Sequence, residues 1–347
     1  MDNESDPFRG VGPLNWSALR TAVPPLPAVP ARYHDAALFV LLAALFGGSF
    51  VAIKTGLREL PPVLFAGLRF DLAAVALLAY VAFSLPRSAW LPRTRGDLLG
   101  IGVAALFLIV LNNGLLFLGQ GTTTPAVASV MYGLNPILAP VFAWWLLGDR
   151  LSWVGALGIV VALAGVVIIV QPTPSTLADA SAVGQLLVLG AAAAVALGSV
   201  LLRRVSPRMD SAPLTAWAMA AGAVMLHASS LAIGEPAESV VGIGPETILS
   251  ILAVGLPSTA VAYAIYFSLI DRVGPVRANL VAYVVPVFAA LMGWLVLGAA
   301  VSVWTAVGFL VVVAGFALIE RQKLSAEVSR LRRRVRGTSP PSSLSDD

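Results

Sequence analysis

The sequence contains no cysteine, and only 12% of its residues are charged. Without thiols, disulfide bonds, thiolate metal sites and cysteine nucleophiles are excluded. Soluble domains carry about 25% charged residues, so a chain with so little charge and 58% hydrophobic residues is not a water-soluble globule. Catalytic Ser/His/Asp sets, metal-ligand spacings and phosphate-binding glycine loops are also missing. We therefore expect no enzyme and no cofactor, and a net charge of +4 gives no reason to expect nucleic-acid binding.

Apolar runs of about 20 residues recur along the chain, each long enough to cross the hydrocarbon core as a helix. Open sheets cannot sit in lipid, and the alternating pattern of a barrel strand is absent. The sequence thus predicts an all-α polytopic membrane protein. Proline, glycine and charged clusters divide the chain into ten expected transmembrane spans. These are residues 36–57, 63–84, 97–119, 123–147, 151–171, 183–204, 212–233, 246–270, 275–297 and 301–320.

An internal repeat organises these spans. The stretch Pro125–Gly165 recurs as Pro275–Gly315, 150 residues later and without a gap. The matched pairs include Pro136 and Pro286, Trp144 and Trp294, Gly158 and Gly308, and Gly165 and Gly315. Repeats of this kind define the architecture of a chain. We expect two five-helix units, residues 36–171 and 183–320, joined by a connector at 172–182. A proline-rich tail, residues 1–35, reads as disordered, and residues 321–347 form a basic and then polar tail.

The distribution of positive charge predicts the orientation. With the N-terminus in the cytoplasm, all of the 22 Lys and Arg residues except Lys54, Arg58 and Arg69 fall on the cytoplasmic side. The positive-inside rule therefore places both termini in the cytoplasm. Because five spans is an odd number, the second unit enters the membrane upside down. Asp149 is then cytoplasmic, whereas its counterpart Ala299 faces out. Inverted repeats are the architecture of many secondary transporters, which hold substrate near the bilayer midplane.

Three short motifs add a family resemblance. They are LFGGSFVAIK at Leu45–Lys54, AGLRF at Ala66–Phe70, and the run from Pro136 to Ser152 that contains Leu-Gly-Asp-x-Leu-Ser. In this order, and with the last motif doubled, the chain resembles the drug/metabolite transporter superfamily, EamA type, over roughly residues 36–320. The resemblance implies a permease or exporter of a small solute in the plasma membrane. One departure is Ala299, which replaces the acidic residue that follows Leu-Gly in the first copy.

The matched prolines Pro136 and Pro286 lie about twelve residues into their spans, roughly 18 Å deep, near mid-bilayer. Each lacks an N–H and frees the carbonyl four residues back, at Tyr132 and Ala282. Interrupted helices at corresponding positions of two halves mark a transport site. Alternatively, each proline is a packing kink that neighbouring helices tolerate. The sequence leaves both interpretations open.

Arg69 and Asp71 are the charged residues well inside a span. A charge there costs roughly 2.5–3.5 kcal/mol on insertion scales, and two residues of separation put the two side chains on nearly opposite helix faces. Each therefore needs a partner on another helix. Arg69 either attracts a substrate anion, or snorkels or pairs structurally. Asp71 is either a protonation site for coupling or a cap on a neighbouring polar group.

The remaining candidates for the substrate pathway are amides and phenols within the spans. They are Asn112, Asn113, Tyr132, Asn135, Tyr263, Tyr266, Asn279 and Tyr283. Such a lining suits neutral, zwitterionic or aromatic-bearing solutes, although interhelical hydrogen bonding alone would also explain it. We expect Lys54 to snorkel at the outer end of its helix and His227 to be packed or hydrogen-bonded.

Together these features predict a secondary transporter of a small organic metabolite that works by alternating access. A lipid-carrier flippase or nucleotide-sugar-type exchanger of the same superfamily, and a non-transporting receptor or assembly subunit, remain as alternatives. The expected partners are the bilayer and the solute, with homodimerisation left open.

Overall fold

The structure is a computed structural model that describes residues 31–149, 152–171, 180–262 and 280–319, and residues 265, 266, 269, 272, 278 and 321. The regular elements in this part of the chain are all helical. The expected disordered tail up to residue 30, most of the connector and most of the basic C-terminal tail lie outside the described residues. So do Tyr263 and Asn279.

Seven helical segments are long and apolar enough to cross a membrane, and they confirm the first seven expected spans. They are α2 (Ala31–Gly56), α3 (Pro62–Ser84), α5–η1–α6 (Arg95–Val103, Ala104–Leu111, Asn112–Thr122), α7–α8 (Pro125–Tyr132, Asn135–Leu147), α9 (Trp153–Val170), α10 (Ala180–Val205) and α11 (Ser211–Ala232). Shorter apolar segments follow: α12 (Pro245–Gly255) with η4 (Leu256–Val261), α15 (Val281–Leu297) and α16 (Val303–Ile319). Two short helices, α4 (Arg87–Trp90) and η3 (Ala237–Val240), lie in connections.

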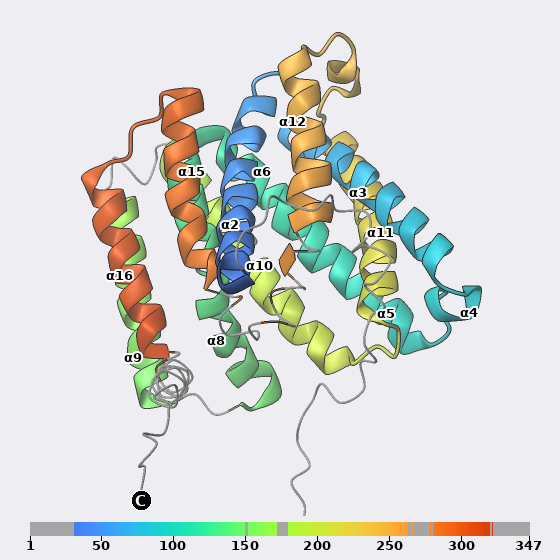
Figure 1. Cartoon of the computed structure of the whole chain (residues 1–347), viewed down its shortest axis with the longest axis horizontal. Helices are drawn as coiled ribbons and strands as arrows, with labels where there is room; N and C mark the ends of the chain where they lie inside the picture. The colour runs from blue at the N-terminus through green and yellow to red at the C-terminus, as the bar shows by residue number, and fades with distance from the viewer. Residues whose placement is uncertain are drawn as a thin grey trace, which may run out of the picture.

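Helices α9 and α16 pack together through the glycines that the repeat matches (Figure 1). A Cβ placed on Gly158 would lie 2.6 Å from the carbonyl oxygen of Gly315, and one placed on Gly165 would lie 2.7 Å from that of Gly308. The two helices therefore run antiparallel with their backbones in contact, as small residues allow in membrane bundles. Each glycine contacts the counterpart of the other, which is the reciprocity of a two-fold-related interface.

The other helices combine elements from both repeats. Helix α3 packs on α11, and α2 packs on α15. Helix α10 packs on α7 and α8. Figure 1 shows α2 in the middle of this view, with α15 on one side of it and α12 on the other. Residues from both repeats thus build a single hydrophobic core.

Helices α8 and α15 end in the same way. Each stops at a left-handed glycine, Gly148 with φ 70° and Gly298 with φ 64°, a conformation that costs glycine little. The next amide then bonds back to the last turn: Asp149 N–H to the carbonyl of Ala143, and the equivalent Ala299 N–H to that of Gly293. Asp149 and Ala299 consequently occupy the same backbone position in the two repeats.

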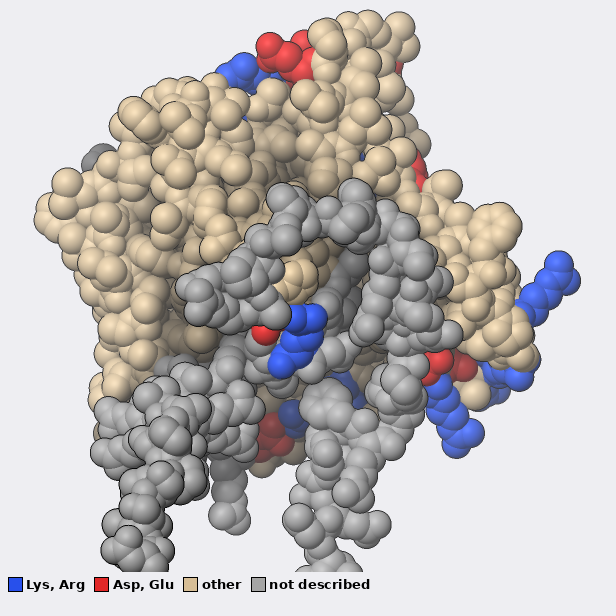
Figure 2. Space-filling view, viewed as in Figure 1, with Lys and Arg blue, Asp and Glu red and all other residues tan. Residues whose placement is uncertain are grey.

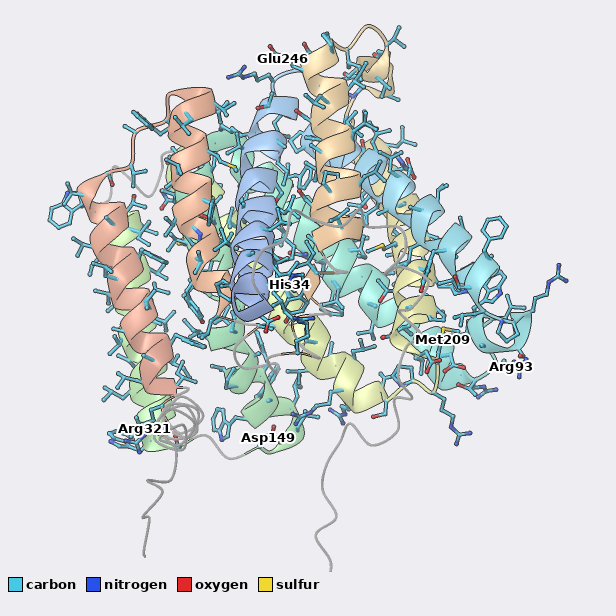
Figure 3. The ribbon with its side chains drawn as sticks, viewed as in Figure 1. His34, Arg93, Asp149, Met209, Glu246 and Arg321 are labelled. Atoms are coloured by element: carbon cyan, nitrogen blue, oxygen red, sulfur yellow. The ribbon has the colours of Figure 1, made fainter. Side chains whose placement is uncertain are left out.

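Charged residues gather at the two ends of the bundle. Figure 3 places Arg93, Asp149 and Arg321 at the lower end and Glu246 at the upper end. In Figure 2 the uncharged surface forms a broad band, with Lys, Arg, Asp and Glu mostly along its upper and lower edges. This is the pattern of a chain that spans a bilayer.

Two sets of hydrogen bonds join the two repeats near these ends. At the lower end, Asp97 Oδ1 accepts the backbone N–H groups of Arg208 and Met209, both at 3.0 Å. At the upper end, Glu59, the counterpart of Met209, accepts the N–H of Gly244 at 2.8 Å. Hydrogen bonds from the Thr247 hydroxyl and from this amide lower the pKa of Glu59. Thr247 is the counterpart of Asp97. The Thr247–Glu59 contact therefore corresponds to the Asp97–Met209 contact, with the carboxylate on the residue equivalent to Met209.

Candidate functional site

The third long helix of each repeat contains a π-helical segment. These segments, η1 (Ala104–Leu111) and η4 (Leu256–Val261), coincide at the 150-residue offset over six positions. π-Helical turns are rare and occur frequently at functional sites. A widened turn disturbs the regular backbone bonding, and side chains bond to the carbonyls here. Asn113 Nδ2 donates to the carbonyl of Ile109 at 3.0 Å, and Thr259 Oγ1 donates to that of Val254 at 2.9 Å.

Arg69 connects the two π-helical regions. From α3, its Nη1 donates to Asn113 Oδ1 at 3.1 Å and its Nη2 donates to Thr259 Oγ1 at 3.3 Å. The expectation that Arg69 has partners on other helices is confirmed, and these two N–H groups are directed into the protein instead of toward the headgroups. A single half-buried cation thereby links the third helix of one repeat to the third helix of the other.

Asp71 lies on a different face of α3. Its Oδ2 is 2.8 Å from Nε2 of His227 on α11, and the Asp71 side chain is 48% exposed. Val75, one turn further along the same face, is 69% exposed and so lies on the outer surface of the bundle. The expected separation of Arg69 from Asp71 is confirmed, and so is a hydrogen-bonded role for His227. Arg69, Asn113 and Thr259 form a hydrogen-bonded group, the Arg69 cluster. The structure does not bring Asp71 into this cluster.

Of the two interpretations of Pro136, the structure shows the interrupted helix. Helix α7 ends at Tyr132 and α8 begins at Asn135, with Gly133 in the turn between them. The carbonyl of Tyr132, which the missing N–H of Pro136 would leave unbonded, accepts a hydrogen bond from Asn135 Nδ2 at 3.2 Å. The sequence therefore supplies both the break and the group that satisfies it.

At Pro286 the helix is not interrupted, so of the two interpretations left open the packing one describes this proline. Helix α15 continues through Pro286 from Val281 to Leu297. Close packing holds this segment: a Cβ on Gly47 of α2 would lie 2.8 Å from the backbone nitrogen of Ala289. Neighbouring helices stabilise proline-containing segments in this way. The carbonyl of Ala282, four residues before Pro286, lies 3.8 Å from a Cβ placed on Gly133. The segments of both prolines therefore meet where α7 crosses α15.

Two expected pathway tyrosines, Tyr132 and Tyr283, lie in this crossing region. The ring of Tyr132 is 6.1 Å from that of Phe50, and the ring of Tyr283 is 4.2 Å from that of Phe316. Tyr266 is half-buried against the core. Asn112, next to the Arg69 cluster, donates to the carbonyl of Leu108 at 3.1 Å.

Two site residues, Ser258 and Thr259, escaped the sequence analysis. Ser258 Oγ bonds to the carbonyl of Leu45 on α2 at 3.1 Å, next to the contact between Thr259 and Arg69. Alignment at the 150-residue offset places them opposite Leu108 and Ile109, the residues whose carbonyls bond to the two asparagines. Their hydroxyl groups within the largely apolar expected span 246–270 were the signal that could have pointed to them.

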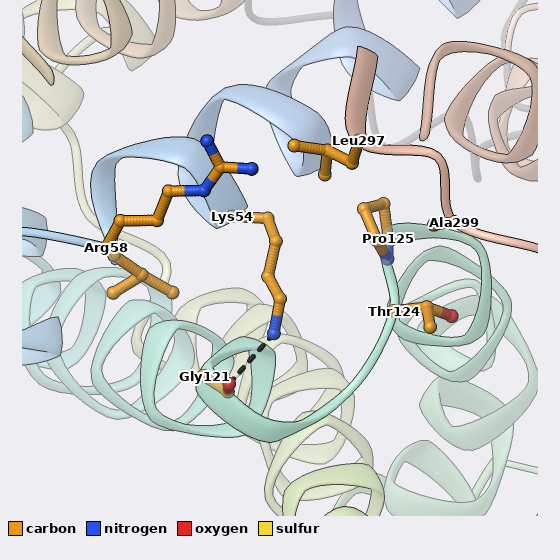
Figure 4. A pocket seen from close by; sticks show the side chains of 8 residues that line it. Lys54, Arg58, Gly121, Thr124, Pro125, Leu297 and Ala299 are labelled. Carbon is orange, nitrogen blue, oxygen red and sulfur yellow. Dashed lines mark hydrogen bonds between the residues drawn. The ribbon is translucent and has the colours of Figure 1, made fainter. Parts of the chain in front are cut away.

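A cavity of about 300 Å³ opens at the upper end, between the last turn of α2, the α6–α7 connection and the end of α15 (Figure 4). Lys54 Nζ lies at its wall and donates to the carbonyls of Gln120 and Gly121, both at 2.8 Å. The last carbonyls of a helix lack intrahelical donors, so Lys54 caps α6. Its ammonium group is bonded to the protein, where we had expected it only to snorkel.

Comparison with known proteins gives a consistent result. The profile of the EamA-like transporter family matches residues 35–171 and again residues 182–321. An uncharacterized inner membrane transporter, YedA of Escherichia coli K12, is 30% identical over 79% of this chain and 87% of its own length. The uncharacterized transporter YoaV of Bacillus subtilis is 26% identical over 80% of this chain and 93% of its own.

Plant and structural relatives extend the comparison. A WAT1-related chloroplastic protein of Arabidopsis thaliana is 27% identical over 81% of this chain and 68% of its own length. A solved crystal structure with 22% identity superposes with a TM-score of 0.56, covering 86% of this chain and 99% of that one. At this identity the superposition supports the fold alone.

Proposed function

Because this chain belongs to the EamA-like transporter family, we propose that it is a secondary transporter that moves a small organic solute across the plasma membrane. It does so by alternating access between two inverted five-helix halves. We also propose that the chain crosses the membrane ten times and that its N-terminus and C-terminus both lie in the cytoplasm. It is a multi-pass membrane protein whose relatives are named transporters.

Inversion is supported by three independent features. The matched glycines of α9 and α16 contact each other reciprocally and antiparallel. Two hydrogen-bonded pairs, Asp97 with Met209 and Thr247 with Glu59, use equivalent positions at opposite ends of the bundle. Among the described residues, the basic side chains concentrate at the lower end, with Lys54 and Arg58 at the upper end. Halves related in this way can exchange conformations, so that the site opens first to one side and then to the other.

The observation that carries the proposal is the position of Arg69. Its guanidinium donates hydrogen bonds to Asn113, beside η1, and to Thr259, in η4. A solute that binds the guanidinium there contacts both halves at once. Arginine binds a carboxylate in bidentate geometry, and nearby amide and hydroxyl groups provide further hydrogen bonds. We therefore propose a solute that is zwitterionic or carries a carboxylate. Asp71, paired with His227 outside this cluster, remains a hypothesis for proton coupling.

The test is flux in liposomes that contain the purified protein. The panel comprises labelled amino acids, other carboxylates, amines, nucleobases and a lipid-linked sugar. We expect saturable flux of at least one small carboxylate-bearing solute. Scrambling of the lipid alone would indicate a flippase, and absence of all flux together with a stably bound protein partner would indicate a receptor or assembly subunit. Either of these outcomes rejects the proposal.

A further inference from the structure

The cavity at the upper end is cationic and partly apolar. Its wall carries Lys54 and Arg58 together with Leu57, Pro125, Leu297 and Ala299, and no lining residue is acidic. Lys54 uses two of its three N–H donors on α6, which leaves one donor. The nearest acidic contact of Arg58 is Glu246 at 3.9 Å, with side chains 59% and 77% exposed. Such an exposed pair contributes little, so the two cations can bind another anion.

The opposite end of the bundle contains the repeat counterparts of several residues that line this cavity. The 150-residue offset pairs Lys54 with Arg204, Arg58 with Arg208 and Leu297 with Leu147. It also pairs Ala299 with Asp149, and both follow a left-handed glycine with the same backbone bond.

At this lower end the chain supplies its own anion. Asp149 Oδ2 accepts a hydrogen bond at 2.6 Å from Nη2 of Arg203, the residue just before the counterpart of Lys54. The upper cavity has only the methyl group of Ala299 at that position. At the lower end an arginine is therefore paired with the carboxylate at position 149, whereas the equivalent position 299 at the upper end provides no carboxylate.

We infer that the upper cavity is a binding site for the carboxylate of a small solute. The carboxylate interacts with Lys54 and Arg58 in the place corresponding to that of Asp149 at the other end, and the apolar part of the solute packs against Leu57, Pro125 and Leu297. A volume of about 300 Å³ is at the small end for ligand pockets, so a solute of small-metabolite size fits. This inference rests on the proposed function, because it makes the cavity the outer access site of the pathway.

The lack of native cysteine allows a direct test. In the full-length Leu297→Cys protein, in detergent, the thiol is modified by an anionic and by a cationic methanethiosulfonate reagent of similar size. Each rate is divided by the rate for a free thiol. We expect the anionic reagent to react at least tenfold faster, since each of the two cations, about 6 Å away, raises the local concentration of an anion and lowers that of a cation roughly threefold in a water-like dielectric. Leu57→Cys serves as a second reporter if Leu297→Cys does not fold.

Variants of two lining residues separate charge from shape. Arg58→Gln, added to the reporter, should lower the preference for the anionic reagent by several-fold. Ala299→Asp should lower it similarly, because the new carboxylate occupies the site as Asp149 does at the other end. Ala299→Asn has nearly the same shape without the charge and should leave the preference unchanged. Equal effects of Ala299→Asp and Ala299→Asn would overturn the inference.

Ligand protection completes the test. Millimolar benzoate should slow modification of Leu297→Cys at least about threefold, whereas benzamide, which lacks the charge, should not. Equal protection by both compounds, or no preference for the anionic reagent, overturns the inference. Protection by added phosphatidylglycerol but not by benzoate would assign the site to a lipid headgroup and overturn it as well. Because the readout does not require flux, a cavity that binds benzoate in a protein without transport would reject the proposed function alone.

Discussion

Arg69→Met is expected to reduce solute flux about 100-fold while the protein still inserts into the membrane. Methionine keeps much of the length of the side chain but removes the donors that reach Asn113 and Thr259. Loss of one partner of a buried charged hydrogen bond typically costs 2–5 kcal/mol, which corresponds to about 30-fold to several thousand-fold in binding. Insertion itself should not suffer, because an intramembrane charge opposes it.

Two further variants define the role of Arg69. Arg69→Lys keeps the charge but loses the bidentate geometry, so we expect an intermediate loss of about tenfold. Arg87→Met, at an exposed position in the first turn of α4, is the matched control and should transport normally. Initial rates in proteoliposomes, normalised to the amount of reconstituted protein, provide the measurement. If Arg69→Met retains flux within about threefold of the native protein, Arg69 is a structural residue and the proposed site is wrong.

Gly165→Leu is expected to cause the largest loss of stability. A Cβ at this position would lie 2.7 Å from the carbonyl oxygen of Gly308 and 2.9 Å from the backbone nitrogen of Val312. Because backbone atoms cannot rotate away as side chains do, α9 and α16 must separate. Overpacking of this kind costs about 3 kcal/mol or more, which lowers the unfolding midpoint by roughly 4 °C or more in a chain of this size.

Gly102→Leu is the control for the same substitution elsewhere. Gly102 lies in α5, and a Cβ there meets no atom within 4 Å. Leucine also has the higher helix propensity, so the midpoint should stay the same or rise. Thermal unfolding of both purified variants, followed by intrinsic fluorescence and by size-exclusion chromatography, makes the comparison. Equal midpoints for Gly165→Leu and Gly102→Leu would show that the glycine contacts do not hold the two halves together.

Much of the fold could be predicted because proline, glycine and tryptophan recur at one offset. Gly158 packs against Gly315, the counterpart of Gly165, and Gly165 packs against Gly308, the counterpart of Gly158. The π-helical segments could not be predicted. The stretch Ala104–Leu111 is uniformly apolar, so it contains no contrast between faces that would reveal a change of helical period.

The sequence also could not decide which of the two interpretations applies at each proline. Proline removes a hydrogen bond wherever it occurs in a helix, but the outcome depends on the neighbours. At Pro136 the chain offers Gly133 and Asn135, which permit and satisfy a break. At Pro286 it offers close packing against Gly47 instead, and this contact depends on the tertiary structure.

Part of the candidate site followed from simple rules. Two charges on opposite faces of α3 required separate partners, and this led to the correct separation of Arg69 from Asp71. The identity of the partners depended on the fold. Thr259 is separated from Arg69 by 190 residues, and His227 by 156 residues from Asp71. Only the packing of the two repeats brings these residues into contact.

The central claim is that two inverted halves alternate, and paired accessibility measurements test it most directly. Leu297→Cys reports on the upper end of α15 and Leu147→Cys on the equivalent lower end of α8, each in the otherwise cysteine-free chain. Modification rates are measured in oriented proteoliposomes, with and without a gradient of the transported solute. The account predicts that any condition that raises the rate at one position lowers it at the other. Rates that rise and fall together, or do not respond to the solute, would contradict it.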